Sequence, residues 1–419
     1  MKSVANFFCY AIIYSKKEGD FMIKRPTYLK KLFDFKDKDL IKVVTGIRRC
    51  GKTTLFDLYI KKLLEEGVSP KQIIHINLED PIFDDLDDYL KLYNYVMKEI
   101  KKDVKYYVFL DEVQNVKEFQ KACDGLYIHK NIDLYITGSN ANLLSGELAT
   151  LLSGRYIEIQ MLPLSFKEYC SNFKEKNYDR LYLDYVNKSS FPYALELDDE
   201  SKIDDYLENI YNTIILKDVM ARKKISDITI FQSVTKFMLS NIGNLLSIKK
   251  ISDTLTSSGR NISVHTVESY LEALTESFIF YKVSRFDIKG KQFLQSGDKY
   301  YVTDVTLRYA LLGRKNLDMG HILENIVFLE LKRRGYKIYV GKSRDKEIDF
   351  VVENKEGFRY YQVAYTVRDP ETLNRELGAL EEIHDHYPKY ILTMDLDPEA
   401  DYDGIRKMNV IDWLLDDKK

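Results

Sequence analysis

The segment Gly46-Ile47-Arg48-Arg49-Cys50-Gly51-Lys52-Thr53 has the residue types and spacing of a phosphate-binding loop, G-x-x-x-x-G-K-[ST]. Its glycines let the backbone wrap a phosphate without a Cβ clash, and N–H groups at the start of the next helix supply partial positive charge. We expect Lys52 to bridge the β- and γ-phosphates of ATP, the Thr53 hydroxyl to ligate Mg²⁺, and Thr54 to contact the α-phosphate. An apolar strand before the loop and an amphipathic helix after it disfavour the alternative, a plain glycine-rich turn.

Two adjacent carboxylates stand at the end of a later apolar run. Residues 106–110 are apolar, and Asp111 and Glu112 follow them directly. In P-loop NTPases an acid at such a strand end holds Mg²⁺ through water, which is the role we expect for Asp111. The next carboxylate, Glu112, is a candidate general base for the attacking water. Adjacent acids commonly belong to a solvated loop. Asp111 and Glu112 indicate a catalytic role only because they end a strand that follows a P-loop.

Three further polar residues are candidates for the same site. Ser139 and Asn140 follow another apolar run and are candidate sensors of the γ-phosphate. The other interpretation is that they cap a short helix at 141–144, and both can hold together. Arg155 is a candidate arginine finger toward the γ-phosphate of a neighbouring subunit; the alternative is a structural or surface arginine.

The elements that must position these residues form an alternating pattern. Short apolar runs separated by amphipathic stretches indicate a parallel sheet covered by helices on both faces, and hence an α/β fold. We expect strands at 41–45, 73–78, 106–110, 134–137 and 156–159, and helices at 53–66 and 86–101. Residues 22–165 are therefore expected to form the core that carries the phosphate site.

The pattern changes after residue 165. Residues 166–224 are charged and helical, which predicts a linker or lid. Three short helical stretches and a strand within 225–299 indicate a winged helix-turn-helix. A second α/β pattern fills 300–419, with a helix at 320–334 and strands at 337–340, 347–352, 360–364 and 390–393. Residues 1–21 lack the features of a signal peptide, and we interpret them as an extension, untranslated or disordered, outside the fold.

The composition is that of an ordinary folded protein. The 419 residues are 45% hydrophobic and 31% charged, with 8 Pro and 19 Gly, which excludes collagen-like and largely disordered chains. Four scattered cysteines and six histidines argue against a zinc site or a disulfide framework and fit a reducing cytoplasm. No apolar run has the length of a membrane span. With 63 Lys and Arg against 65 Asp and Glu, any nucleic-acid site must be a local patch.

These motifs together resemble the AAA-type ATPases, and most closely a prokaryotic group whose loop is G-x-R-R-x-G-K-T. The group also has L-D-E-x-Q, T-G-S-x-x-x-L-L-S, S-G-R and P-L-S-F-x-E-Y, which here are residues 110–114, 137–145, 153–155 and 163–169. This resemblance covers residues 22–170, and the group's later region, long of unknown function, resembles 200–395. The resemblance implies an ATP-binding core, a helical linker, a winged-helix element and a nuclease-like terminal domain.

Positions in the last domain resemble the PD-(D/E)xK nuclease pattern. They are Glu324 on a helix, Asp349 in a strand and Gln362 in the next strand. In such sites carboxylates hold Mg²⁺ and a lysine orients the attacking hydroxide. Here Ala364 stands where the lysine belongs, and Gln362 replaces a carboxylate. We therefore expect a restriction-endonuclease-like α/β fold without nuclease activity. The alternatives are a nuclease that uses Glu324 and Asp349, or plain structural roles for both.

The segment 221–293 is basic in a chain of net charge −2, with eleven Lys and Arg against six Asp and Glu. Such a local excess suits contacts with a phosphate backbone, so double-stranded DNA is a candidate partner. The expected recognition helix, 263–277, offers His265 to bases but also carries Glu268 and Glu272, which oppose DNA. Winged helices also bind proteins, so a protein partner or self-association remains open.

The hypothesis from the sequence is a cytoplasmic, Mg²⁺-dependent AAA-type ATPase whose turnover moves its C-terminal domains, in the first instance on DNA. In this hypothesis ATP binds the P-loop, Thr53 and Asp111 hold the metal, and Glu112 activates water. One alternative is a nucleotide-gated switch that acts on a protein partner. The other is the DNA nuclease that uses Glu324 and Asp349.

Overall fold

The computed structural model consists of two compact units, with the boundary between Met161 and Leu162. This boundary lies close to the expected end of the first domain at 165. The expected extension at 1–21 is outside the described residues. The structure describes residues 23–144, 152, 154–214, 219–220, 225, 227–290, 292–294, 297–314 and 318–416.

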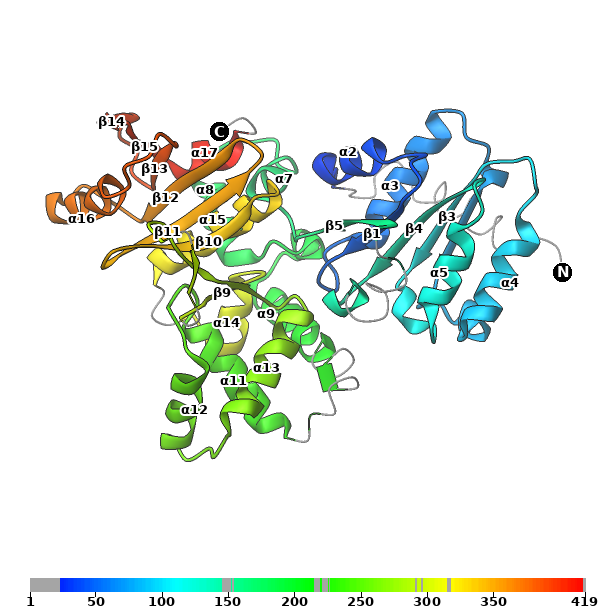
Figure 1. The fold of residues 1–419 in the computed structure, drawn as a ribbon, viewed down its shortest axis with the longest axis horizontal. Helices are drawn as coiled ribbons and strands as arrows, with labels where there is room; N and C mark the ends of the chain where they lie inside the picture. Colours follow the sequence, from blue (N-terminus) through cyan, green and yellow to red (C-terminus); the bar gives the residue numbers. More distant parts are fainter. Residues whose placement is uncertain are drawn as a thin grey trace. The chain divides into compact units, whose positions relative to one another are not determined.

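The first unit is built on a five-stranded sheet with the strand order β2-β3-β4-β1-β5, in which all neighbours are parallel (Figure 1). This arrangement confirms the predicted α/β class. The strands are β1 Ile41–Thr45, β2 Ile73–Asn77, β3 Tyr106–Asp111, β4 Ile132–Gly138 and β5 Tyr156–Gln160. The α-helices are α2 Pro26–Asp34, α3 Lys52–Glu65, α4 Tyr89–Glu99 and α5 Phe119–Tyr127. Short 3-10 turns are η1 Pro70–Gln72, η2 Pro81–Leu86, η3 Val113–Asn115 and η4 Ala141–Leu144.

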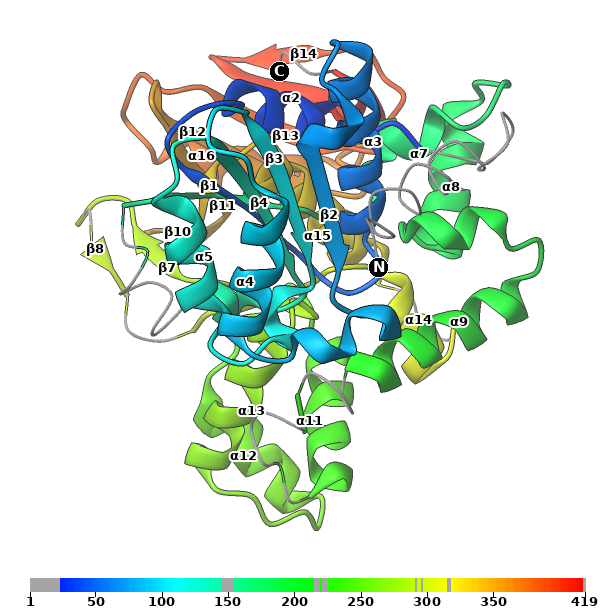
Figure 2. The same ribbon diagram turned by 90° about the vertical axis from the view of Figure 1, so that its right-hand side faces the viewer.

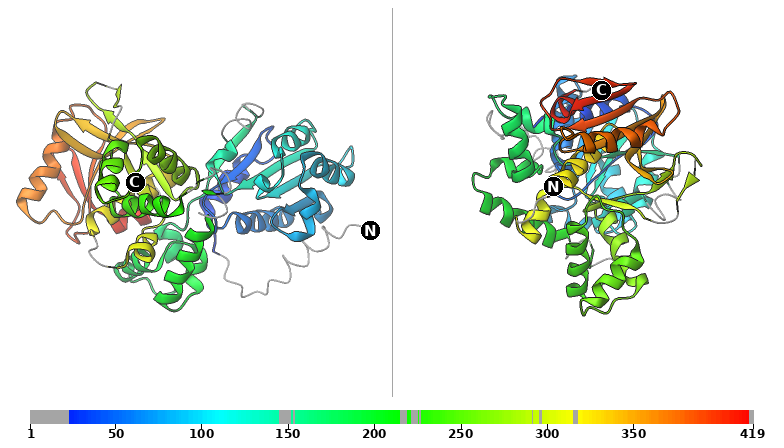
Figure 3. Two further views of the ribbon diagram at one scale, coloured as in Figure 1. Left: turned by 90° about the horizontal axis from the view of Figure 1, so that it is seen from below. Right: turned by 90° about the vertical axis from the view of Figure 1, so that its left-hand side faces the viewer.

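The two faces of this sheet have separate cores, because successive residues of a strand point to opposite faces. In β3, Val108 and Leu110 belong to the apolar cluster that includes α4 and α5. Phe109 points the other way and packs edge-on against Phe56 of α3, with ring centroids 5.1 Å apart. Figures 1 and 3 show α2 and α3 on one face and α4 and α5 on the other. Both faces are covered, which explains the continuous apolar strands.

The second unit begins with helices. Figure 2 shows α11, α12 and α13 gathered into one group, and Phe231 of α11 packs edge-on against Tyr270 of α13. Strands β6 and β9 form a separate two-stranded antiparallel sheet. The helices of this part are α7 Phe166–Cys170, α8 Tyr178–Lys188, η5 Pro192–Glu196, α9 Glu200–Thr213, α11 Ile228–Ser240, α12 Ile248–Ser257, α13 Val264–Glu276 and α14 Thr306–Leu312. The two strands of this sheet are β6 Phe280–Val283 and β9 Lys299–Val302.

The rest of the second unit is a mixed eight-stranded sheet in the order β14-β15-β13-β12-β11-β10-β7-β8. Its strands are β7 Arg285–Asp287, β8 Gln292–Phe293, β10 Lys337–Ser343, β11 Lys346–Asn354, β12 Gly357–Ala364, β13 Lys389–Thr393, β14 Ala400–Tyr402 and β15 Ile405–Asn409. Its helices are α15 Met319–Arg333, α16 Pro370–Glu381 and α17 Val410–Leu415. An apolar cluster joins α16 to one face. On the other face Phe328 of α15 packs near Phe350, and Trp413 of α17 packs against Tyr361.

The C-terminal sheet does not respect the domain boundary that the sequence predicts at residue 299. β7 and β8 lie before that position in the sequence, yet β7 pairs in parallel with β10 and extends the C-terminal sheet. Phe286 of β7 packs against Tyr339 and Phe358 of this sheet. The single strand expected within 225–299 is therefore replaced by β6 and β7, which belong to different sheets. In the described parts of the chain, no helix combines the length and the apolar character needed to cross a membrane.

Candidate active site

The phosphate-binding loop lies between the end of β1 and the start of α3. A Cβ on Gly46 would lie 2.2 Å from the carbonyl oxygen of Met161, so no side chain fits at this position. Gly51 caps α3 with a φ of 101°, a left-handed conformation that favours glycine. The loop therefore turns tightly and directs the first N–H groups of α3 toward its hollow, as anion binding at a helix N-terminus requires.

The side chain of Lys52 is buried and points into the loop. Its Nζ donates hydrogen bonds to the carbonyl oxygen of Gly46 at 3.1 Å and to the Ser139 hydroxyl at 2.8 Å. It also forms an ion pair with Oε1 of Glu112 at 3.1 Å. Burial acts to lower the pKa of Lys52, but Glu112, Cys50 and Asp111 together outweigh it and the pKa is raised. Lys52 is therefore a charged ammonium at neutral pH.

Asp111 lies at the carboxyl end of β3, next to the start of α3. The Thr53 hydroxyl donates to its Oδ2 at 2.5 Å, and the Thr137 hydroxyl donates to its Oδ1. Burial and the neighbouring Glu112 raise the pKa of Asp111, while the two hydroxyls act to lower it. The Asp111 carboxylate and the Thr53 hydroxyl thus lie side by side, as two oxygen atoms that could ligate a metal ion.

Glu112 is held from several sides. The Ser139 hydroxyl lies 2.8 Å from Oε1 and 2.7 Å from Oε2, and Nε2 of Gln114 donates to Oε2 at 2.5 Å. Burial acts to raise the pKa of Glu112, but the Lys52 ammonium and the hydrogen bonds from Gln114 and Ser139 lower it to about 2. The carboxylate is therefore ionised at neutral pH and paired with the expected phosphate-binding lysine.

The structure brings five of the sequence-predicted residues together at one edge of the sheet: Lys52, Thr53, Asp111, Glu112 and Ser139. The remaining loop residues lie around this group. Ile47 and Cys50 are buried, Thr54 is half-buried, Arg49 is exposed, and Arg48 pairs with Glu79 at 2.7 Å. Asn140 is buried, and its carbonyl oxygen accepts a hydrogen bond from the N–H of Leu143 in η4, so it belongs to the turn that was the alternative interpretation.

Arg155 is not brought together with these residues. It precedes β5, whose first residue, Tyr156, pairs with Ile41 at the start of β1. The P-loop follows the other end of β1, so Arg155 lies about 15 Å away, one strand length, at the opposite edge of the sheet. There its guanidinium pairs with Asp124 at 2.5 Å and stacks over Tyr127. A role in the site of a neighbouring subunit stays a prediction.

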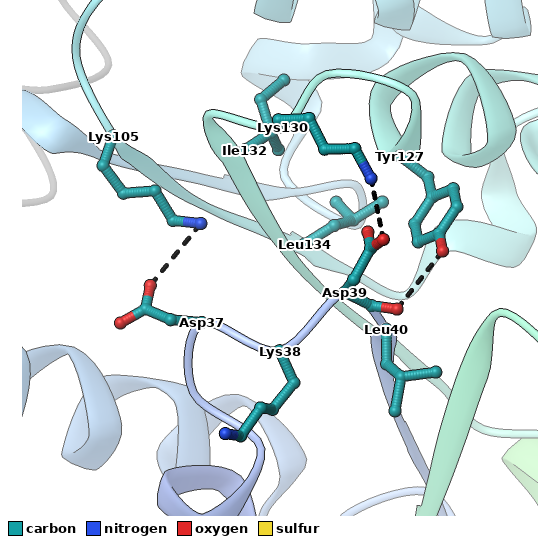
Figure 4. Close-up of a pocket in the computed structure, with 9 residues that line it drawn as sticks. All are labelled: Asp37, Lys38, Asp39, Leu40, Lys105, Tyr127, Lys130, Ile132 and Leu134. Atoms are coloured by element: carbon teal, nitrogen blue, oxygen red, sulfur yellow. Dashed lines mark hydrogen bonds and ion pairs between the residues drawn. The ribbon is translucent and has the colours of Figure 1, made fainter.

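A hollow of about 220 Å³ lies at this opposite edge, where β1, β3 and β4 begin (Figure 4). Two of its three lysines form ion pairs: Lys105 lies 3.5 Å from Asp37, and Lys130 lies 2.8 Å from Asp39. Figure 4 also shows the Tyr127 hydroxyl donating to the Asp39 carbonyl. The hollow contains none of the sequence-predicted site residues.

Three residues at the candidate active site were missed by sequence reasoning. Arg25, just before α2, is buried, and its Nη1 donates to the carbonyl oxygen of Cys50 in the P-loop at 3.0 Å. Gln114 and Thr137 contact the two acids, as described above. Gln114 and Thr137 belong to the motifs that carry the family resemblance, which was the available signal. Arg25 precedes those motifs, and nothing in the sequence connects it to the loop.

A second charged cluster lies in the C-terminal unit. Glu324 and Asp349, the two acids of the expected nuclease-like pattern, both lie near Lys299, and Oε1 of Gln362 accepts a hydrogen bond from the N–H of Asp349. The centre of the cluster is Lys299 of β9, which the sequence did not suggest. Its Nζ lies 2.8 Å from Glu324, 2.8 Å from Glu347 and 3.6 Å from Asp349. Burial and Glu324 raise the pKa of Asp349 to about 8, although Lys299 acts to lower it.

The basic segment 221–293 is only partly described. Arg222, Lys223, Lys224 and Lys291 lie outside the described residues. The described part holds seven cations and six acids. The cations are Lys236, Lys249, Lys250, Arg260, Lys282, Arg285 and Lys289. None of them lies on α13, whose exposed residues include His265, Glu268 and Glu272.

The chain is similar to proteins from bacteria and archaea. A family model described as an AAA domain matches residues 38–170, and a model described as a domain of unknown function matches residues 179–318. The Walker-type ATPase of Pyrococcus abyssi has a similar structure, with a TM-score of 0.49 and 14% identity over 69% of this chain and 96% of that chain. An uncharacterized protein of Methanocaldococcus jannaschii is 32% identical over 81% of this chain and 78% of its own length. An uncharacterized protein of Haemophilus influenzae is 40% identical over 94% of this chain and 99% of its own length. The chain therefore belongs to the same family as the Haemophilus influenzae protein, and its N-terminal part contains an AAA domain.

Proposed function

We propose that this protein binds ATP with Mg²⁺ and hydrolyses it at the P-loop edge of the first unit. The observation that carries the proposal is the connected group of side chains beside the loop: Thr53 on Asp111, and Lys52 and Ser139 on Glu112. A cation for phosphate thus pairs with an ionised carboxylate for water, two oxygen ligands for a metal contact each other, and Thr137 is hydrogen-bonded to both acids.

The oxygen ligands fit Mg²⁺. Within the described ranges, no group of three or more His, Cys, Asp or Glu side chains is arranged to hold a metal. A P-loop site does not need one, because Mg²⁺ there keeps several waters and is held by one or two protein oxygens and the phosphates. Thr53 and Asp111 supply two such oxygens. When bound, the ion neutralises charge that develops on the phosphate oxygens.

The chain's own residues perform the remaining steps. The Lys52 ammonium binds phosphate oxygens and so gives up part of its pairing with Glu112. The pKa of Glu112 then rises from its low value, because the nearest cation is shared with the phosphates. Glu112 accepts a proton from the attacking water, and the Ser139 hydroxyl keeps the carboxylate in place.

ATP hydrolysis by the purified full chain tests the proposal. Lys52→Ala is expected to lose ATP binding, and Glu112→Gln to bind ATP while turnover falls about 100-fold or more, as for loss of a general base. Glu118→Gln is the matched control, because Glu118 is near in sequence but pairs only with Lys121 at the surface among the contacts described here. Unchanged turnover in Glu112→Gln would overturn the assignment of Glu112. The absence of Mg²⁺-dependent turnover in the natural chain would overturn the proposal.

A second candidate function is coupling of this turnover to double-stranded DNA. Exposed cations at the two ends of α12, Lys249, Lys250 and Arg260, support it. The acidic surface of α13 argues against base readout by that helix, so the contacts we propose are with the phosphate backbone. Binding to duplex DNA should fall steeply with salt and should weaken in the Lys249→Glu, Lys250→Glu double variant. If the chain instead binds a protein partner, and salt does not weaken that binding, the nucleotide-gated switch is favoured.

The residues of the C-terminal cluster do not fit a metal-dependent nuclease. The Lys299 ammonium already pairs with Glu324, Glu347 and Asp349, the acidic side chains that a divalent ion would need. Gln362 uses both ends of its amide, accepting from the N–H of Asp349 and donating to Glu376. We derive no cleavage step from this cluster.

A further inference from the structure

We propose that Thr137 is a positioning residue that holds both acids of the ATP site, an inference that rests on the proposed ATPase function. Thr137 lies near the carboxyl end of β4, between β1 and β3, and is completely buried. Its hydroxyl donates to Oδ1 of Asp111 and accepts a hydrogen bond from the backbone N–H of Glu112 at 2.8 Å. One side chain on a neighbouring strand is therefore bonded to two consecutive functional residues.

The direction of these two hydrogen bonds is fixed by chemistry. A backbone N–H can only donate and an ionised carboxylate can only accept, whereas a hydroxyl has one proton and two lone pairs. Serine and threonine are thus the small side chains that can satisfy both groups at this position. Valine has nearly the same shape as threonine and can satisfy neither.

The hydrogen bond to Glu112 supports an unusual backbone conformation. Glu112 has a φ of 53°, in the left-handed region that a non-glycine residue adopts only when its surroundings support it. Its N–H is buried beside β4, and Thr137 provides the acceptor. This conformation turns the Glu112 side chain toward Lys52 and Ser139. Thr137 therefore sets where the general base points.

The hydrogen bond to Asp111 complements that of Thr53. The two hydroxyls occupy different oxygens, Thr53 on Oδ2 and Thr137 on Oδ1. If the Thr53 hydroxyl were to ligate a metal ion, the Thr137 hydroxyl would still be hydrogen-bonded to Oδ1 of Asp111 and would hold the orientation of that carboxylate. The loss of Thr137 should therefore affect steps that need the metal and the base, and should spare the contacts of the P-loop with phosphate.

The test compares Thr137→Val and Thr137→Ser with the natural chain. For Thr137→Val we expect ATP affinity in EDTA within about twofold of the natural chain, a higher Mg²⁺ requirement, and a kcat about ten- to 100-fold lower. Thr137→Ser retains the hydroxyl and should keep kcat within about threefold. Thr45→Val is the matched control, because Thr45 is a buried threonine of β1 whose hydroxyl donates to Glu158 rather than to either acid. The control should leave the Mg²⁺ requirement unchanged.

The outcomes separate this inference from the proposed function. If Thr137→Val has the same turnover and the same Mg²⁺ requirement as the natural chain, the inference is overturned and the proposed ATPase function stands. If the natural chain binds ATP but does not hydrolyse it, the ATPase proposal fails, and the Mg²⁺ dependence of ATP affinity in Thr137→Val then decides the positioning role alone. A chain that does not bind ATP would overturn both. ATP binding by Thr137→Val in EDTA shows that the variant is folded.

Discussion

Nζ of Lys52 lies 3.1 Å from Oε1 of Glu112, so the lysine expected to bind phosphate and the carboxylate expected to activate water form a buried ion pair. The same ammonium also donates to the Ser139 hydroxyl, which lies within 2.8 Å of both oxygens of Glu112. Phosphate and Glu112 must therefore compete for one cation. This competition links the binding of the triphosphate to the basicity of the carboxylate.

The ion pair should give the first unit a characteristic dependence on pH. The pKa of Glu112 is lowered from an ordinary value of 4.5 to about 2, so the pair stabilises the folded state above pH 4.5 and loses this contribution as the pH falls toward 2. Lys52→Met should therefore be less stable than the natural chain at neutral pH, and the difference should shrink between pH 4.5 and 2. Thermal unfolding across this range measures it. A difference that stays constant with pH would contradict the assigned pair.

Ser139 and Asn140 can be told apart by substitution. The Ser139 hydroxyl contacts both Lys52 and Glu112, whereas Asn140 uses its backbone carbonyl to hold η4. We expect Ser139→Ala to lower kcat about tenfold, as for loss of a hydrogen bond to a charged group, and Asn140→Ala to lower it less. Steady-state ATP hydrolysis at saturating ATP provides the measurement. The reverse order would make Asn140 the sensor.

Arg25 should support ATP binding from outside the motif. Its guanidinium donates to the Cys50 carbonyl within the P-loop. Arg25→Met leaves this carbonyl without that donor, and we expect ATP affinity to fall about three- to tenfold with kcat unchanged at saturation. Lys30→Met is the control, because Lys30 is an exposed cation of α2, the helix that follows Arg25. Isothermal titration calorimetry with ATP and Mg²⁺ measures the ATP affinity of both variants. Equal affinities would contradict the role of Arg25.

Lys299 should be essential to the stability of the C-terminal unit. Lys299→Met leaves Glu324, Glu347 and Asp349 without their central cation, and we expect a loss of about 3–5 kcal/mol, as when one partner of a buried ion pair is removed. Lys282→Met in the neighbouring strand β6 is the control, since its pair with Asp298 is partly exposed and should contribute about 0–1 kcal/mol. Denaturant unfolding compares the two variants.

A second substitution strengthens this test. Glu324→Gln in the Lys299→Met background removes one of the uncompensated charges and should recover part of the lost stability. EDTA should not destabilise the natural chain, because Lys299 already pairs with the acids of this cluster. A natural chain that EDTA destabilises, or that cleaves DNA with added Mg²⁺, would contradict this account of the cluster.

The sequence by itself determined the parts of the site that depend on neighbours along the chain. The P-loop follows β1, and Asp111 and Glu112 follow an apolar strand, so their places at strand ends could be predicted from apolar periodicity and local motifs. The continuous apolar strands also predicted the parallel α/β sheet, because only a sheet covered on both faces buries every residue of a strand. These features need no knowledge of which strands are neighbours.

Only the tertiary structure decided the contacts between distant segments. The sheet places β4 between β1 and β3, which puts Thr137 on Asp111 and Ser139 on Lys52 and Glu112. It places Arg155 at the far edge, because β5 runs parallel to β1 and begins where β1 begins. Chain folding likewise brings Lys299 to Glu324 and Asp349. Such contacts depend on strand order and on how elements pack, and the spacing of residues along the sequence does not contain that information.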